Sequence, residues 1–403
     1  MTHRKTIGVG LISVGWMGRL HSRAYLAAAQ HYPEIPVRAA LVVAADPDEK
    51  SREYATDVLG YRESVSDYRA VLAHPDVDVV SICSPNFLHE EMALAAIAAG
   101  KPFWIEKPMG RGVLESRHIA EAASAAQVVS SVGFNYRNAP AVEHARRLVR
   151  DGALGTITNV RVAFMADYSA DPLGALTWRF KRDLAGSGVL GDLLSHGADL
   201  AQYVVGRIVS VTAMTETFIP QRPLPASGAV SHFSRGTEDA PMGSVENEDY
   251  AALLARFAGG GVAVLESSRV SVGPRAQYVL EVYGTKGSLR WDFQRMNELE
   301  IADDLSGFRT VLMGPGMGDF ARFQPGAGTG MGFDDLKTVE ASLFLRSVLE
   351  NRQYSASATD AWAAAEIVHA AQTSAETGAW VAVGETMTQH GPSQSGLTDD
   401  VVS

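Results

Sequence analysis

The sequence predicts an α/β Rossmann domain with a parallel, doubly wound sheet, followed by an α+β domain with a large, mostly antiparallel open sheet. The chain of 403 residues exceeds the size at which a single hydrophobic core stops growing. Up to residue 134, short apolar runs alternate with helical patterns, as they do around parallel sheets. After residue 150 the apolar runs lengthen and alternate in part with polar residues, which is typical of antiparallel strands with one covered face.

We therefore assign residues 1–134 to the first domain and residues 135–385 to the second. In the first domain the strands are expected at almost wholly apolar runs, because both faces of a doubly wound sheet are covered. In chain order these runs are "TIGVGLIS", "VRAALVVAAD", "VDVVSICS", "PFWIEKP" and "QVVSSVGFN". The helices between them are expected at 17–30, 47–58 and 66–73, in "HEEMALAAIAAG" and at 113–126.

The second domain begins its strands after residue 150. They are expected at "ITNVRVAFMADYS", "VSVTAMTETFI", "DYAALLARFAG", "VAVLESSRVSVG", "QYVLEVYGTKGSLRWDF" and "LEIAD". Helices are expected at 188–206, 334–350 and 357–376, and irregular segments rich in Gly and Pro at 220–247 and 313–333. The polar C-terminal tail, 386–403, is assigned no structure.

The composition excludes several classes of partner. The chain carries 35 Lys+Arg against 46 Asp+Glu, a net charge of −11, so a nucleic-acid partner is not expected. No run approaches the roughly 18 to 20 apolar residues of a membrane span, so no membrane partner is expected either. Cys83 is the only cysteine, which rules out an intramolecular disulfide and is consistent with a reducing compartment; we expect the cytoplasm.

The turn after the first strand has the spacing of a dinucleotide-binding loop, with one glycine replaced. Ser13, Gly15 and Gly18 occupy the three positions of G-x-G-x-x-G between an apolar strand and a helix. The alternative register, on Gly8 and Gly10, would place the turn inside the strand. In the first register Gly15 lets a pyrophosphate approach the backbone, and Gly18 lets the helix pack on the strand. Serine is small and tolerated in turns, so we interpret Ser13 as a variant that preserves the motif.

The end of the second strand supports a nucleotide site. Asp46 stands where an acid hydrogen-bonds the adenosine ribose and repels a 2′-phosphate, and Pro47 follows with no adjacent arginine, so NAD is favoured over NADP. We expect Trp16 and Met17, inside the glycine turn, to contact the same cofactor. The simpler alternative is that the glycines only form a turn and that Asp46 caps a helix.

Three further blocks occur along the chain: "SPNFLHEEMALAAIAAGKPFWIEKP", "GFNYRNAPAV" and "AGSGVLGDLLSH". Together with the glycine turn they resemble the signatures of the glucose–fructose oxidoreductase and inositol dehydrogenase (Gfo/Idh/MocA) family. The resemblance is dense over residues 7–206 and looser beyond them. It implies a Rossmann domain followed by an open, mostly antiparallel sheet, in agreement with the fold predicted above.

Several residues at strand ends are expected to bind the cofactor, because nucleotides lie outside the carboxyl ends of such strands. His89 on its own would more often be structural, and the resemblance favours a role at the site. Glu106 of "EKP" and the asparagine of "GFNY" are placed there as well. With Ser13, Gly15, Trp16, Met17, Gly18 and Asp46, the expected cofactor residues are Ser84, Pro85, Asn86, His89, Glu106, Lys107, Asn135, Trp178 and Arg179.

Lys107 and Pro108 complete the "EKP" block. A lysine at the carboxyl edge of a sheet can hydrogen-bond a substrate hydroxyl and favour its deprotonation. The common alternative for a lysine is a surface position, but the family uses this lysine in catalysis. An X-Pro bond can be cis, and the resemblance raises that chance for the bond before Pro108.

Asp192 and His196 lie four residues apart in the helix predicted at 188–206, so they share a face. An acid that positions an imidazole is the usual arrangement for a general base, and Asp192 could instead bind a neighbouring hydroxyl. A helical hydrogen bond without chemistry and a metal pair are the alternatives; no third ligand stands at useful spacing, so no metal is expected. The family's D-x-x-x-H pattern favours catalysis, with Lys107, Asp192 and His196 as the catalytic set.

Aromatic and basic groups suit a polyhydroxylated ligand. Besides the catalytic set, the expected substrate contacts are Tyr136, Arg137, Tyr168 and Trp178, for which packing between the domains is the ordinary alternative. The resemblance implies an NAD-dependent dehydrogenase that oxidises a secondary hydroxyl of a sugar, a levoglucosan-like anhydrosugar, a glycoside or an inositol. The alternatives are an NAD-using glycosidase of the same fold and a non-catalytic NAD-binding sensor. Apolar positions on the second sheet predict a homodimer or homotetramer.

Overall fold

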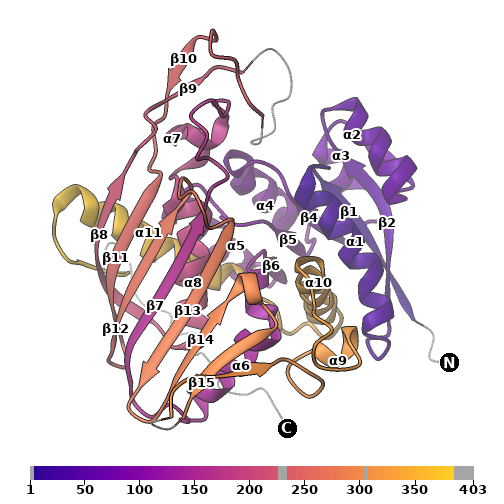
Figure 1. The fold of residues 1–403 in the computed structure, drawn as a ribbon. Helices are drawn as coiled ribbons and strands as arrows, with labels where there is room; N and C mark the ends of the chain where they lie inside the picture. Colours follow the sequence, from indigo (N-terminus) through magenta and orange to yellow (C-terminus); the bar gives the residue numbers. More distant parts are fainter. Residues whose placement is uncertain (1–3, 226–233, 304–305, 385–403) are drawn as a thin grey trace.

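The computed structural model describes residues 4–225, 234–303 and 306–384. Two sheets dominate it, a small one in the indigo N-terminal part and a large one across the magenta and orange part (Figure 1). The predicted tail, 386–403, lies outside the described residues. The two sheets confirm the predicted fold class, an α/β Rossmann unit joined to an α+β unit.

Sheet A holds six parallel strands in the order β3-β2-β1-β4-β5-β6. The strands are β1 (Lys5–Ile12), β2 (Val37–Ala45), β3 (Glu63–Val65), β4 (Val79–Ile82), β5 (Phe103–Ile105) and β6 (Ser130–Val132). The main helices between them are α1 (Trp16–His31), α2 (Glu49–Tyr54), α3 (Tyr68–Ala73), α4 (His89–Ala98) and α5 (Val113–Ala125). All of the first domain's predicted strands are confirmed, and the short β3 is an addition.

Sheet B holds nine strands in the order β16-β15-β14-β13-β7-β12-β11-β8-β17, and only the β7–β12 pair is parallel. The strands are β7 (Ile157–Ala166), β8 (Ile208–Glu216), β11 (Tyr250–Phe257), β12 (Val262–Ser268), β13 (Ala276–Gly284), β14 (Ser288–Asp292), β15 (Glu298–Ala302), β16 (Arg309–Leu312) and β17 (Val381–Ala382). The short β16 and β17, at the sheet's edges, were not predicted.

Burial explains the difference between the two sheets. In β1 the last six residues are all buried, because helices cover both faces of sheet A. In β11 buried residues alternate with less buried ones, since helices α6 (Pro140–Arg150), α8 (Ser195–Val204) and α11 (Ala358–Thr377) lie against one face only. The other face leaves Met214, Leu254, Val262 and Val264 exposed. The oligomer expected at that face stays a prediction.

Helix α10 (Phe333–Glu350) returns from the second half of the chain to the first domain, where it lies beside α1 (Figure 1). Its Phe344 packs with Tyr25 of α1 and Trp104 of β5 in one buried cluster. The N-terminal core is thus completed by a segment more than two hundred residues away. The domain boundary at residue 134 remains a prediction.

Some elements differ from the prediction. The single helix expected at 188–206 is a π-helical turn, η5 (Leu190–Leu194), followed by α8. Helix α6 was not predicted, and the irregular segments contain β9 (Gln221–Pro223) paired with β10 (Met242–Ser244), and α9 (Phe320–Phe323). Within the described ranges, no helix has the length and apolar character needed to cross a membrane.

Candidate active site

A cavity of about 230 Å³ is lined both by strand ends of sheet A and by residues of the second domain. It brings together most of the predicted site residues: Trp16, Met17, Ser84, Asn86, His89, Glu106, Lys107, Asn135, Tyr136, Tyr168, Trp178, Arg179, Asp192 and His196. Ser13, Gly15, Gly18, Asp46 and Pro85 do not line it, but they lie at the carboxyl edge of the same sheet: Gly18 in the first turn of α1, and the others in the loops after β1, β2 and β4.

The glycine turn has the geometry that its register predicts. Ser13 adopts a φ of +76°, in the left-handed region that glycine normally occupies. A Cβ on Gly18 would lie 2.1 Å from the carbonyl oxygen of Ser13, so this glycine permits the close packing of α1 on β1. A Cβ on Gly15 would meet only the Ser13 hydroxyl, at 3.9 Å, which leaves the turn open on that side.

The end of β2 is tied to this turn. One carboxylate oxygen of Asp46 accepts a hydrogen bond from the Val14 amide at 2.8 Å, and the other accepts one from the Asp48 amide at 3.0 Å. Arg52 donates to the backbone carbonyls of Asp46 and Pro47, both at 2.9 Å. Arg52 is therefore a spatial neighbour of the acid expected to bind the ribose, although no arginine is adjacent to it in sequence.

These features fit a dinucleotide. The N-terminus of α1 has no acidic residue in its first turn and carries the partial positive charge that attracts phosphate. The open side of Gly15 leaves room for a pyrophosphate against the backbone, and the Asp46 carboxylate stands at the end of β2, the position from which an acid hydrogen-bonds the ribose in such folds.

Lys107 and Asp192 form an ion pair at the wall of the cavity. The ammonium of Lys107 donates to the Asp192 carboxylate at 2.9 Å and to its main-chain carbonyl at 2.8 Å. The Tyr168 hydroxyl donates to the other carboxylate oxygen at 2.6 Å, and Arg179 lies 3.7 Å away. Burial alone would raise the pKa of Asp192, but the charges of Lys107 and Arg179 outweigh it and hold that pKa well below its usual value.

His196 faces the same cavity among aromatic rings. Its imidazole lies edge-on to Tyr136, with ring centroids 4.8 Å apart, and to Phe134 at 5.7 Å. Burial, and then the charge of Lys107, lowers the pKa of His196 well below its ordinary value. No hydrogen bond from a described residue reaches its ring nitrogens, so Asp192 does not orient the imidazole as one prediction had it; its carboxylate is taken by Lys107 and Tyr168.

Glu106, the residue before Lys107, belongs to a different network. Its carboxylate accepts hydrogen bonds from Lys337 of α10 at 2.6 Å and contacts His21 at 3.0 Å. Lys337 also contacts Glu340, at 2.9 Å, and both lysine and histidine are fully buried. Lys337 and His21 outweigh the effect of burial and hold the pKa of Glu106 well below its usual value. Glu106 thus borders the cavity while its charge is neutralised from the core side.

His89 and Asn86 join neighbouring loops. The two ring nitrogens of His89 contact the carbonyls of Ser84 and Pro108 at 2.8 and 2.9 Å, so this residue bridges the ends of β4 and β5. Asn86 donates to the carbonyl of Ala185 at 3.3 Å, which connects the first domain to the second. The Lys107–Pro108 peptide bond is cis, as the sequence suggested it could be.

One predicted substrate contact is not at the cavity. The guanidinium of Arg137 is bonded to Asp199, with an Nε–Oδ2 distance of 2.8 Å, and to Asp360 at 3.2 Å. Conversely, five residues that were not predicted line the cavity: Cys83, Gly133, Phe164, Leu193 and Phe333. Phe164 and Phe333 carried no local signal, because they come from β7 and the start of α10 and depend on how the chain folds back.

The sequence matches models of both parts of a known family. Residues 7–134 match "Oxidoreductase family, NAD-binding Rossmann fold", and residues 142–290 match the GFO/IDH/MocA C-terminal domain. The chain therefore belongs to the Gfo/Idh/MocA oxidoreductases and binds NAD through its Rossmann domain.

Within this family the chain is similar to sugar and polyol dehydrogenases. It is 37% identical to levoglucosan dehydrogenase from Pseudarthrobacter phenanthrenivorans over 94% of this chain and 98% of the relative. It is 27% identical to inositol 2-dehydrogenase from Rhizobium meliloti over 74% of this chain and 79% of that protein. A structure of levoglucosan dehydrogenase with NADH and levoglucosan superposes with a TM-score of 0.88 at 35% identity, covering 94% of this chain and all of that one. The protein is an NAD-binding sugar or polyol oxidoreductase.

Proposed function

We propose that the protein oxidises a secondary hydroxyl of an anhydrosugar or a related glycoside to a ketone, with levoglucosan as the leading substrate. The observation that carries the proposal is the presence of Lys107, Asp192 and His196 on one cavity beside the NAD-binding edge of sheet A. Bound NAD⁺ supplies the acceptor for the hydride that leaves the carbon of the substrate.

In this proposal Lys107 and Asp192 hold the reacting hydroxyl. A lysine ammonium has three donors, and two of those of Lys107 reach the carbonyl and carboxylate of Asp192, which leaves one for a substrate oxygen. A positive charge next to that oxygen stabilises the negative charge that develops as the proton leaves. The second carboxylate oxygen of Asp192 is bonded to Tyr168, so the acid stays ionised and fixed in place.

His196 takes the hydroxyl proton in this proposal. Its depressed pKa keeps the imidazole neutral at pH 7, the form that can accept a proton. Its ring nitrogens are not engaged by any residue in the described part of the chain, so they are free for a ligand. The proton passes from the substrate oxygen to the imidazole while the carbon loses its hydride, which gives a ketone and a protonated His196.

The lining of the cavity supports a sugar. Trp16, Tyr136, Phe164, Tyr168 and Trp178 offer aromatic faces to the C–H surface of a ring, and charged groups offer partners to its hydroxyls. The similarity to levoglucosan dehydrogenase over nearly the whole chain supports the anhydrosugar in particular. NAD is proposed over NADP, because the Asp46 carboxylate would repel a 2′-phosphate.

The test is NADH formation by the purified protein with NAD⁺ or NADP⁺ and a panel of levoglucosan, inositols, glucose, xylose and glycosides. We expect turnover with NAD⁺ and an anhydrosugar. His196→Asn and Lys107→Met should each lower kcat by roughly 10²- to 10⁴-fold while NADH binding persists. Product without net NADH would instead indicate a glycosidase, and tight NAD binding with no reaction on any compound would indicate a sensor.

A further inference from the structure

The segment "NED", residues 247–249, consists of three consecutive polar residues that are all buried, with exposures of 2%, 8% and 0%. It lies between β10 and β11 and does not line the cavity. Buried polar groups need partners, so each of the three side chains must be held by something. Glu248 and Asn247 contact the two stretches of chain that carry Asp192 and Arg179, and Asp249 contacts Arg269 at the end of sheet B.

Glu248 holds the segment that leads into η5. Its carboxylate accepts hydrogen bonds from the amides of Gly188 at 2.8 Å and Leu190 at 3.0 Å, and its main-chain carbonyl accepts one from the Val189 amide at 3.1 Å. A Cβ on Gly188 would lie 2.0 Å from the Glu248 carbonyl oxygen, so the two strands of chain are in direct contact. Asp192 follows within the same turn, its amide bonded to the Gly188 carbonyl at 3.0 Å.

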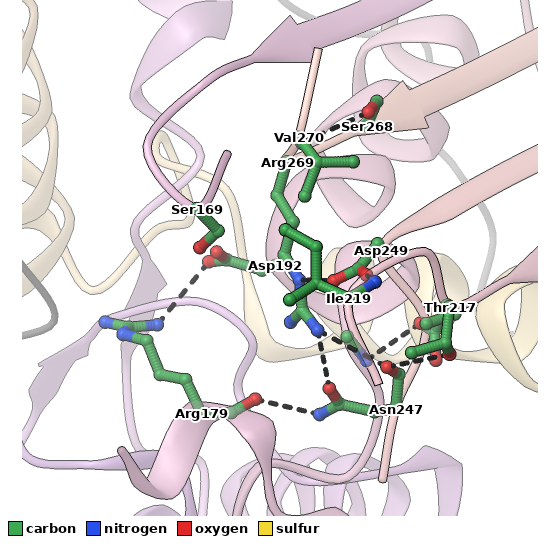
Figure 2. Close-up of polar contacts among 12 residues, drawn as sticks. Ser169, Arg179, Asp192, Thr217, Ile219, Asn247, Asp249, Ser268, Arg269 and Val270 are labelled. Atoms are coloured by element: carbon green, nitrogen blue, oxygen red, sulfur yellow. Dashed lines mark hydrogen bonds and ion pairs between the residues drawn. The ribbon is translucent and has the colours of Figure 1, made fainter. Parts of the chain in front are cut away.

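Asn247 holds the stretch with Trp178 and Arg179. Its side-chain amide donates to the main-chain carbonyl of Arg179 at 2.8 Å, and its side-chain oxygen accepts from Arg269 at 2.9 Å. Figure 2 shows this chain of contacts running from Arg269 through Asn247 to Arg179, whose guanidinium turns toward Asp192. The guanidinium also lies over the Trp178 ring, 4.6 Å from its centroid.

Asp249 anchors the segment to sheet B. It pairs with Arg269 at 2.7 Å, in an ion pair whose side chains are 0% and 3% exposed, and it accepts from the Ile219 amide at 2.9 Å (Figure 2). Hydrogen bonds to both members of this buried pair hold the two side chains in a single geometry, and breaking the pair would leave an uncompensated buried charge. The anchor therefore fixes where Asn247 and Glu248 lie.

We propose that Asn247 and Glu248 are positioning residues: together they set the separation between Arg179 and Asp192 and hence the shape of the sugar-binding side of the cavity. Neither residue lines the cavity, and neither contacts the glycine turn. Their effect is therefore expected on the sugar and on turnover, and not on the cofactor. The inference rests on the proposed function for its kinetic part, since Asp192 is there a partner of Lys107.

The kinetic test compares Glu248→Ala with Glu248→Gln, which keeps the oxygen that accepts both amides. Glu266→Gln, on β12, is the matched control, because it changes a carboxylate that pairs with Tyr250 outside the cavity. With levoglucosan and NAD⁺ as the probe, Glu248→Ala should lower kcat/KM by roughly 10- to 100-fold, because a misplacement of catalytic groups by about 1 Å can cost that much. Glu248→Gln should recover most of it, and the dissociation constant of NADH should stay within about twofold in all three variants.

A second measurement does not depend on activity. Hydrogen–deuterium exchange of a peptide covering residues 186–194 should be much faster in Glu248→Ala than in the wild type and in Glu248→Gln, because the amides of Gly188 and Leu190 lose their acceptor in the first variant and keep it in the second. Equal exchange and equal kinetics in Glu248→Ala and the wild type would overturn the proposal, as would equal losses in Glu248→Ala and Glu248→Gln.

Asn247→Asp covers the case in which Glu248→Ala does not fold. It keeps the oxygen that Arg269 contacts and removes the donor to the Arg179 carbonyl, so KM for the sugar should rise while NADH binding persists; an unchanged KM would overturn the proposal. If the wild-type protein oxidises no member of the panel, the proposed function fails. The exchange measurement then still decides whether Glu248 holds the turn that carries Asp192.

Discussion

Two charge networks beside the cavity start at adjacent residues, Glu106 and Lys107. The side of the cavity formed by the strand ends of sheet A, with Glu106, is called the nucleotide wall, and the side formed around Asp192, the partner of Lys107, is called the sugar wall after its proposed ligand. Glu106 connects to Lys337 and His21 in the core of the nucleotide-binding domain, where the lysine and histidine are fully buried. Lys107 connects to Asp192, and the side chains of this pair remain 16% and 23% exposed. In the first network the partners of Glu106 are enclosed by protein and only the edge of its carboxylate borders the cavity, whereas both members of the second pair line the cavity and can contact a ligand.

The difference separates structural charges from functional ones. A closed network contributes by leaving no charge uncompensated, so any partner removed from it exposes the others to the full penalty of burial. An open network can exchange a protein partner for water or for a substrate hydroxyl. Substitutions in the nucleotide wall should therefore lower mainly the stability of the protein, and substitutions in the sugar wall should lower mainly its turnover.

The largest expected effect is that of Lys337→Met compared with Lys107→Met. Lys337→Met leaves the carboxylates of Glu106 and Glu340 buried without their cation, and the free energy of unfolding should fall by roughly 3–5 kcal/mol. Lys107→Met leaves Asp192 with Tyr168 and Arg179 beside a cavity, so its stability should change by about 1 kcal/mol or less while turnover is lost. Denaturant unfolding measures both, and equal losses would contradict the distinction.

The next effect is the pH dependence of stability that His21 causes. Burial, against the hydrogen bond to Glu106, lowers the pKa of His21 from 6.5 to about 4. Between these two pH values the unfolded chain binds a proton that the folded chain does not, so stability is complete above pH 6.5 and declines toward pH 4, by roughly 3 kcal/mol.

Denaturant unfolding from pH 7 to pH 4 checks this, with His21→Gln as the comparison. The variant has no group that titrates at this position, so its stability should fall less steeply than that of the wild type over the same range. Parallel curves would show that His21 keeps an ordinary pKa in the folded protein, and the closed network would then have to be described without a neutral imidazole.

The nucleotide wall could be predicted from the sequence because its residues are local. Ser13, Gly15 and Gly18 lie between the end of β1 and the first turn of α1, Asp46 and Glu106 directly follow β2 and β5, and Asn86 lies four residues after β4. Alternation of strands and helices was therefore enough to place them on one edge. What could not be read there was long-range. Lys337 lies on α10, and no sequence pattern near Glu106 indicates that this lysine is its partner.

For the sugar wall, the sequence predicted which residues take part but not which of them contact each other. Asp192 and His196 were found by their spacing, yet the expected helix is a π-helical turn followed by α8, and the expected Asp192–His196 contact is replaced by bonds to Lys107 and Tyr168. Arg137 was misplaced for the same kind of reason: its partners Asp199 and Asp360 are distant in sequence. Local periodicity indicates which residues share an element, and not which charges meet.

Two glycines give a matched comparison of the walls. A Cβ would lie 2.1 Å from the Ser13 carbonyl oxygen in Gly18→Ala, and 2.0 Å from the Glu248 carbonyl oxygen in Gly188→Ala. Both clashes are with backbone, so each wall must move. Gly18→Ala should weaken NADH binding by about tenfold or more, and Gly188→Ala should lower kcat/KM for the sugar by roughly 10- to 100-fold with NADH binding retained.

Calorimetry with NADH and steady-state kinetics distinguish the two effects. Gly259→Ala is the control, because a Cβ there would meet no atom within 4 Å. Should Gly188→Ala weaken NADH binding as much as Gly18→Ala does, the walls would be coupled through the backbone, and their independent support by separate networks would have to be abandoned.

The smallest effect concerns Ser13, the residue that departs from the glycine pattern. At a φ of +76° an L-residue is strained by roughly 1–2 kcal/mol, whereas glycine loses about 0.5–1 kcal/mol more chain entropy on folding. Ser13→Gly should therefore stabilise the protein by about 0.5–1 kcal/mol. Ser13→Ala keeps the strain and removes the hydroxyl, so it should leave stability nearly unchanged. If the hydroxyl donates to a phosphate oxygen, both variants should bind NADH several-fold more weakly; unchanged binding in both would show that serine here is tolerated by the turn and used by neither wall.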